Sequence, residues 1–115
     1  MQHHLRDEVS RLHAQVCSGL ADPNRILILY TLSEHPYSVN ELADALDLPQ
    51  STTSRHLKVL RERGMVESER SGQMVEYTLA DQRIIQALDL LREFMSDWLD
   101  AQADLARGVS QALEG

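Results

Sequence analysis

Apolar residues recur at the spacing of a helix in the first twenty residues of the chain. Leu5, Val9, Leu12 and Val16 are three or four positions apart. Residues on one face of an α-helix repeat at this interval, so the pattern predicts an amphipathic helix over residues 5–20.

A second helix is expected to begin at Asp22-Pro23. The aspartate carboxylate can cap free backbone amides, and proline fits the first turn of a helix. The helix continues to Glu34, and the loop His35-Pro36-Tyr37 is expected to end it. Its apolar stripe consists of Ile26, Leu29, Tyr30 and Leu32.

Residues 38–63 predict two short helices around a tight turn. Ser38 and Glu41 have the spacing of a capping box, in which each side chain bonds to the other residue's backbone amide. A third helix is therefore expected to start there. Asp47-Leu48-Pro49 forms the turn before a fourth helix over residues 50–63. The third helix is expected to bury Val39, Leu42 and Leu46.

Apolar and polar residues alternate in the segment after Gly64. Glycine supplies the left-handed backbone that commonly ends a helix. The runs Met65–Arg70 and Gln73–Leu79 are separated by Ser71-Gly72 and predict a β-hairpin.

Helical periodicity returns after the hairpin and predicts a last helix over residues 81–113. Four helices, a β-hairpin and a fifth helix predict a mainly α fold with a small β-hairpin, which is a winged helix-turn-helix. One domain is expected over residues 1–115, with the helix-turn-helix at 38–63 and the wing at 65–79.

The charge of the chain is unevenly distributed. The 115 residues carry a net charge of −7, which at first argues against a polyanionic partner. Residues 50–74, however, hold five cations and three carboxylates, whereas residues 81–115 hold three cations and seven carboxylates. The acidic residues thus lie away from the fourth helix, as expected when one face of a protein approaches phosphates and another stays solvated.

The fourth helix has one face for packing and one for solvent. On a helical wheel Thr53, Leu57 and Leu60 share one side, while hydroxyls and cations occupy the other. Short hydroxyls can contact phosphates or bases, arginine can bond bidentately to guanine, and lysine suits phosphate. The outward set is Ser51, Thr52, Arg55 and Lys58.

Several motifs together resemble the ArsR/SmtB family of bacterial repressors. They are Leu20-Ala21-Asp22-Pro23-Asn24-Arg25, Ile28-Leu29, Glu41-Leu42-Ala43, Gln50-Ser51-Thr52, Ser54-Arg55-His56-Leu57-Lys58-Val59-Leu60 and Gly64-Met65-Val66 with Tyr77. The resemblance covers about residues 12–95. It implies a sequence-specific DNA-binding repressor that acts on double-stranded DNA as a homodimer, with the helices at 5–20 and 81–113 forming the dimer interface.

The resemblance also implies which residues contact DNA. They are Ser51, Thr52, Ser54, Arg55, His56 and Lys58 on the fourth helix, with Arg70 and Gln73 at the tip of the wing. His56 lies on the flank of the wheel, where a packed, hydrogen-bonded side chain is an equal alternative to a DNA contact. Pro49 and Thr53 depart from the capping serine and the valine or isoleucine frequent in the family, which predicts a shifted helix start and less apolar packing.

The metal sites of the family are mostly missing. Ala43 and Ala45 occupy the cysteine positions of its thiolate motif, and none of the five histidines lies beyond residue 56. His13 and Cys17, four residues apart, are the weak candidates that are left, for a metal or for redox control. We expect no cofactor, and the alternative for Cys17 is a small interface thiol.

The sequence leaves two further alternatives open, one for the last helix and one for the class of protein. Phe94, Met95, Trp98 and Leu99 suit a dimer core or, less readily, a pocket for an apolar effector. Winged helices also serve as protein-interaction modules, which the net acidity favours and the hydroxyl-rich fourth helix disfavours.

Other classes of protein are disfavoured. No Ser-His-Asp set, phosphate-binding glycine loop or metal triad indicates an enzyme. The chain has no signal-peptide pattern or membrane span, and its one cysteine cannot form an intrachain disulfide. These features predict a cytoplasmic protein.

Overall fold

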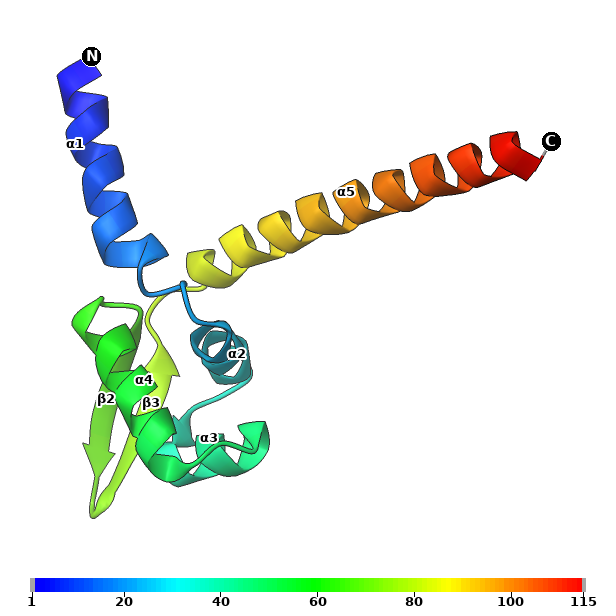
Figure 1. Cartoon of the computed structure of the whole chain (residues 1–115). Helices are drawn as coiled ribbons and strands as arrows, with labels where there is room; N and C mark the ends of the chain where they lie inside the picture. The colour runs from blue at the N-terminus through cyan, green and yellow to red at the C-terminus, as the bar shows by residue number, and fades with distance from the viewer. Residues whose placement is uncertain (1, 115) are drawn as a thin grey trace. The chain divides into compact units, whose positions relative to one another are not determined.

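The computed structural model describes residues 2–114. Its elements are α1 (Gln2–Leu12), the short π-helix η1 (His13–Cys17), α2 (Pro23–Leu32), β1 (Tyr37–Ser38), α3 (Val39–Leu46), α4 (Gln50–Glu62), β2 (Val66–Ser71), β3 (Met74–Leu79) and α5 (Arg83–Glu114). They form two compact units, Met1–Gln82 and Arg83–Gly115 (Figure 1). The fold class is the predicted one, a mainly helical winged helix-turn-helix. That residues 1–115 fold as one domain stays a prediction.

The caps predicted for two helices are present. The Asp22 carboxylate accepts a bond from the Asn24 amide at 2.8 Å, with Pro23 on the first turn of α2. The Ser38 amide donates to Glu41 at 2.8 Å, and the Glu41 amide donates to the Ser38 hydroxyl at 3.2 Å. The Ser38 amide and, to a smaller extent, the Ser38 hydroxyl lower the pKa of Glu41, because hydrogen bonds to the carboxylate stabilise its charged form.

The sheet has one more strand than the sequence predicts. β1 pairs antiparallel with β3, with Tyr37 opposite Tyr77, so the order of strands is β1-β3-β2. The predicted loop His35-Pro36-Tyr37 therefore ends in a strand. A two-residue strand has no period of its own, and its partner lies about forty residues away along the chain, so no local pattern indicates it.

The turn of the hairpin is also displaced from the prediction. Ser71 pairs with Met74, which leaves Gly72 and Gln73 as the turn in place of Ser71-Gly72. Gly72 has φ +67°, a conformation that side chains with a Cβ atom rarely adopt. β2 is thus shifted by one residue along the chain, β3 is one residue shorter than expected, and Gln73 lies at the tip of the wing.

The core of the first unit lies between the helices and one face of the hairpin. Leu29 from α2, Leu42 from α3 and both Leu57 and Leu60 from α4 are at most 1% exposed. The packing face predicted for the fourth helix is confirmed, since Thr53 is buried with them. Of the apolar residues predicted to be buried in α3, Leu42 is buried, whereas Val39 and Leu46 are only half-buried.

The helix predicted over residues 5–20 is not regular along its length. Its α-helical part ends at Leu12, η1 adds one π-helical stretch, and residues 18–20 form a turn. Periodicity predicts the helix but not the change of its hydrogen bonding, because the contacts at η1 come from the far end of α4.

The second unit is a single helix. α5 comprises 32 residues, which corresponds to about 48 Å at the usual rise per residue. From Leu90 onward its large apolar side chains are more than half exposed, among them Phe94, Met95, Trp98 and Leu99, whereas Leu88 is buried. Within residues 2–114 no helix combines the length and the apolar character that a membrane span needs.

Candidate nucleic-acid interface

The start of α4 is fixed by Pro49 and Thr53. The Pro49 carbonyl accepts bonds from both the amide and the hydroxyl of Thr53, each at 3.0 Å. The Thr53 side chain is fully buried, so this bond satisfies its only polar atom inside the core. The helix begins at Gln50 as the turn predicts, and the expected shift of its start is not observed.

The outward face of α4 carries the residues that the sequence predicts for DNA contacts. Ser51, Ser54, Arg55 and Lys58 are exposed, and Thr52 is half-buried beside them. The Arg55 Nη2 atom donates to the Thr52 hydroxyl at 3.4 Å. This bond draws the guanidinium back toward the start of the helix, where the hydroxyls lie. Four of the five side chains are thus exposed and accessible to a ligand.

His56 lies on the flank of α4 and faces the protein. Its side chain is 13% exposed and its Nε2 atom is 4.0 Å from an oxygen of Asp22. The Nδ1 atom is 3.4 Å from Nη1 of Arg25. Because a guanidinium has only donors, Nδ1 accepts, and a neutral ring carries its proton on Nε2, toward Asp22. The His56 side chain is thus packed and hydrogen-bonded within its own chain, and its contact with DNA stays a prediction.

Arg25 connects this flank to the segment before α2. Its Nε atom donates to the Gly19 carbonyl at 2.8 Å, and its Nη2 atom lies 3.3 Å from the Ser18 carbonyl. In the sequence Arg25 is notable only as part of a family motif, which does not predict this role. The one local signal is its place three residues after the cap Asp22; its partner His56 is 31 residues away.

On the wing, Arg70 lies on one face of the hairpin and the carboxylates lie on the other. Side chains alternate between the two faces of a strand, so Arg70 shares a face with Ser68 and the buried Val66. The opposite face carries Glu67, Glu69 and Glu76, of which Glu69 and Glu76 are directly paired. Arg70 is exposed and lies on the face that packs against the helices. The acidic residues of this segment therefore do not share a face with Arg70.

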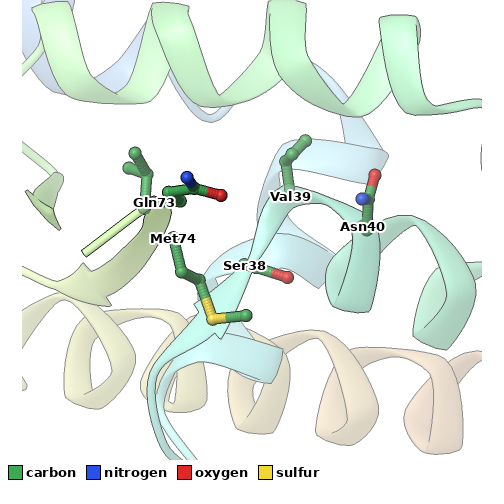
Figure 2. A pocket seen from close by; sticks show the side chains of 6 residues that line it. Ser38, Val39, Asn40, Gln73 and Met74 are labelled. Carbon is green, nitrogen blue, oxygen red and sulfur yellow. The ribbon is translucent and has the colours of Figure 1, made fainter. Parts of the chain in front are cut away.

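Gln73 and the start of α3 line an open pocket of about 390 Å³. Figure 2 shows Val39 and Asn40 of α3 across from Gln73 and Met74 of the wing. None of its six lining residues is charged, and the largest apolar one, Met74, is 55% exposed. Gln73 thus lies at the tip of the wing beside the first turn of α3.

The residues considered for a metal, His13 and Cys17, have no third ligand close to them within residues 2–114 of the chain. His13 and Cys17 are both exposed on η1. Within residues 2–114 no three His, Cys, Asp or Glu side chains lie close enough together to hold a metal ion. Two ligands do not make the four-coordinate site that zinc requires, and the expected absence of a cofactor stays a prediction.

Comparisons with known proteins agree with this geometry. Residues 22–68 match the family model described as bacterial regulatory protein, arsR family. The chain is 41% identical over 83 residues to the HTH-type transcriptional regulator NmtR of Mycobacterium tuberculosis, covering 70% of this chain and 69% of that protein. The chain belongs to the ArsR family. It is a DNA-binding transcriptional regulator, as its relatives are.

This ArsR-family protein is also similar to one protein described as a repressor and to one described as a homodimer. It is 43% identical over 77 residues to the HTH-type transcriptional repressor SmtB of M. tuberculosis, which covers 67% of this chain and 57% of that protein. A solution structure from Mycobacterium bovis is described as the homodimeric winged helix-turn-helix DNA-binding domain of a possible ArsR-family regulator. It has a TM-score of 0.69 and 26% identity and covers 86% of this chain and 88% of that one.

Proposed function

We propose that this ArsR-family protein is a homodimeric repressor that recognises a palindromic DNA site through α4 and the wing. The observation that carries the proposal is the exposed face of α4, on which hydroxyls and cations lie opposite a fully buried packing face. A helix with this division can enter the major groove while its other side stays in the core.

Different residues of this face have different tasks in the proposal. Arg55 reads a guanine by two hydrogen bonds, and the bond to Thr52 holds its side chain near the base edges. Ser51, Ser54 and Lys58 contact phosphates and fix the position of the helix on the duplex. Arg70 and Gln73 contact the backbone beside the groove. His56 supports α4 from the protein side.

The apolar stripes of α1 and α5 support the homodimer. Leu5, Val9 and Leu12 on α1 are each about half exposed, and Trp98 and Leu99 on α5 are similarly exposed. Such long apolar stripes are costly in water, and a second copy of the same chain would cover them. The described homodimer of the M. bovis relative supports the same assembly. Reading helices of the two subunits would then lie about 34 Å apart, or a multiple of this, one turn of DNA.

The test begins with a duplex selected by the wild-type protein from a random pool. Arg55→Ala should weaken binding to that duplex by roughly 5- to 150-fold, the value of one bidentate contact, at a fixed salt concentration. Affinity for random duplex should fall much less, because it depends on the total charge. Native mass spectrometry of both proteins should give twice the chain mass.

The matched control is Arg11→Ala, which also removes one exposed cation but lies on α1, off its apolar stripe. Equal losses in Arg55→Ala and Arg11→Ala would show that only net charge matters. Unchanged affinity of Arg55→Ala for the selected duplex would contradict the proposed DNA contact. A monomeric mass of the wild-type protein at micromolar concentration would contradict the proposed homodimer.

A further inference from the structure

The π-helix η1 frees a backbone carbonyl. In an α-helix the Ser18 amide would bond to the Ala14 carbonyl, four residues earlier. Here it bonds to the His13 carbonyl at 3.0 Å, five residues earlier. The Ala14 carbonyl therefore accepts other bonds, one of them from the Ser18 hydroxyl. Such π-bulges occur mostly as single turns and frequently at functional sites.

The freed carbonyl bonds to the end of α4. Nη1 of Arg63, the residue that caps α4, donates to the Ala14 carbonyl at 2.7 Å. In return Nε2 of Gln15 donates to the Arg63 carbonyl at 2.8 Å. We call these two reciprocal bonds the η1–α4 clasp. Gln15 and Arg63 are 48 residues apart in sequence, so only the tertiary structure brings them together.

Close packing surrounds Gly19, next to the clasp. A Cβ atom built on Gly19 would lie 3.1 Å from the Sδ atom of Met65, which begins the wing segment. Gly19 is buried, and its carbonyl also accepts the bond from Arg25. The segment between α1 and α2 is thus held to α4 at both its ends, through Arg63 and through Arg25 and His56.

We propose that Gln15 and Arg63 are positioning residues that set the separation of the two reading helices in the dimer. The inference rests on the proposed homodimer, in which α1 lies at the interface. The clasp then links the interface helix directly to the end of the reading helix of the same subunit. A dimer with an intact clasp prefers one spacing of half-sites, and a dimer without it accepts neighbouring spacings with smaller penalties.

The experiment compares duplexes that differ only in half-site spacing. The duplex selected by the wild-type protein is lengthened or shortened by one and by two base pairs between its half-sites, and a duplex with a single half-site is added. Gln15→Met keeps the size and charge of the side chain and removes the donor. Its affinity should fall about threefold to tenfold at the preferred spacing and less at the others, with single half-site binding unchanged.

Variants of Arg63 provide the control for charge. Arg63→Gln and Arg61→Gln each remove one cation at the end of α4, but Arg61 is exposed and makes no bond to η1. Only Arg63→Gln should make the affinity for DNA depend less on the half-site spacing. Arg63→Lys keeps a donor for the Ala14 carbonyl, so its affinity should depend on half-site spacing as that of the wild type does. If Gln15→Met lost its helical circular dichroism signal, the spacing profiles of Arg63→Gln and Arg63→Lys would test the proposal in its place.

The outcomes separate this proposal from the proposed function. A spacing profile of Gln15→Met that equals the wild-type profile would overturn the proposal. So would an equal proportional loss on every duplex, including the single half-site, because that result indicates general damage to the fold. A wild-type protein that selects no duplex, or has no preferred spacing, would instead remove the proposed dimeric function itself.

Discussion

His56 on α4 and Arg25 on α2 are joined by a contact of 3.4 Å between Nδ1 and Nη1, on the flank of the helix that faces the protein. The contact connects the reading helix to the carbonyls of Ser18 and Gly19, which Arg25 also binds. His56 is part of a motif that resembles DNA-contacting residues of the family, but its ring is held inside its own chain. A support role and a DNA role for His56 predict different effects of mutation.

His56→Ala should destabilise the fold by about 1–2 kcal/mol, because Arg25 loses a partner in a largely buried position. Urea unfolding followed by circular dichroism measures this change. Ser54→Ala is the matched control on the same helix, since Ser54 is exposed and a surface change is usually within about 0.5 kcal/mol. If His56→Ala were as stable as the wild type but had an altered base preference, His56 would be a DNA contact and not a support of the fold.

Thr53 should tolerate valine better than serine. Valine keeps the shape of the buried side chain and loses one hydrogen bond, while the Pro49 carbonyl keeps its bond from the residue 53 amide. Thr53→Val should therefore change the free energy of unfolding by less than about 1 kcal/mol. Thr53→Ser removes a buried methyl group and should cost about 1 kcal/mol or more. If serine proved the milder change, the hydroxyl would matter more than the packing.

Arg70→Ala should weaken DNA binding about equally for the selected and the random duplex. A phosphate contact carries no base information, so its loss lowers affinity without relaxing specificity. The slope of log affinity against log salt should become less negative by about one. Glu69→Gln is a useful comparison, since Glu69 lies on the opposite face of the wing. A larger loss on the selected duplex than on the random one would indicate a base contact for Arg70.

Acid should remove a contribution of Glu41 to stability. Its pKa in the folded chain lies below the ordinary value of 4.5, because the Ser38 amide and hydroxyl bond to the carboxylate. The stabilisation is therefore complete above that ordinary value and is lost as the pH falls through the lower folded pKa. Glu41→Gln can still accept the bond from the Ser38 amide but does not titrate.

The difference in unfolding free energy between wild type and Glu41→Gln should accordingly be constant near neutral pH and shrink in acid. Denaturant titrations from about pH 3 to pH 7 measure it. A difference that grows in acid would contradict the assigned direction of the pKa shift.

Local patterns were sufficient for most of the architecture. The capping box at Ser38 and Glu41, the packing stripe through Leu57 and Leu60 and the hairpin after Gly64 each depend on neighbours within a few residues. Local hydrogen bonding and periodic burial express such features directly in sequence. The outward face of α4 was predictable for the same reason, because the helical period determines which side chains oppose the core.

The sequence by itself thus determined the order of the five helices and the hairpin, the packing face of α4 and the residues on its exposed face. The tertiary structure alone decided β1, the π-helical turn of η1, the inward placement of His56 and the clasp between Gln15 and Arg63. β1, the placement of His56 and the clasp each depend on a partner 31 or more residues away in sequence. A local pattern records the bonds a residue makes to its neighbours, whereas these bonds exist only after the chain has brought distant segments into contact.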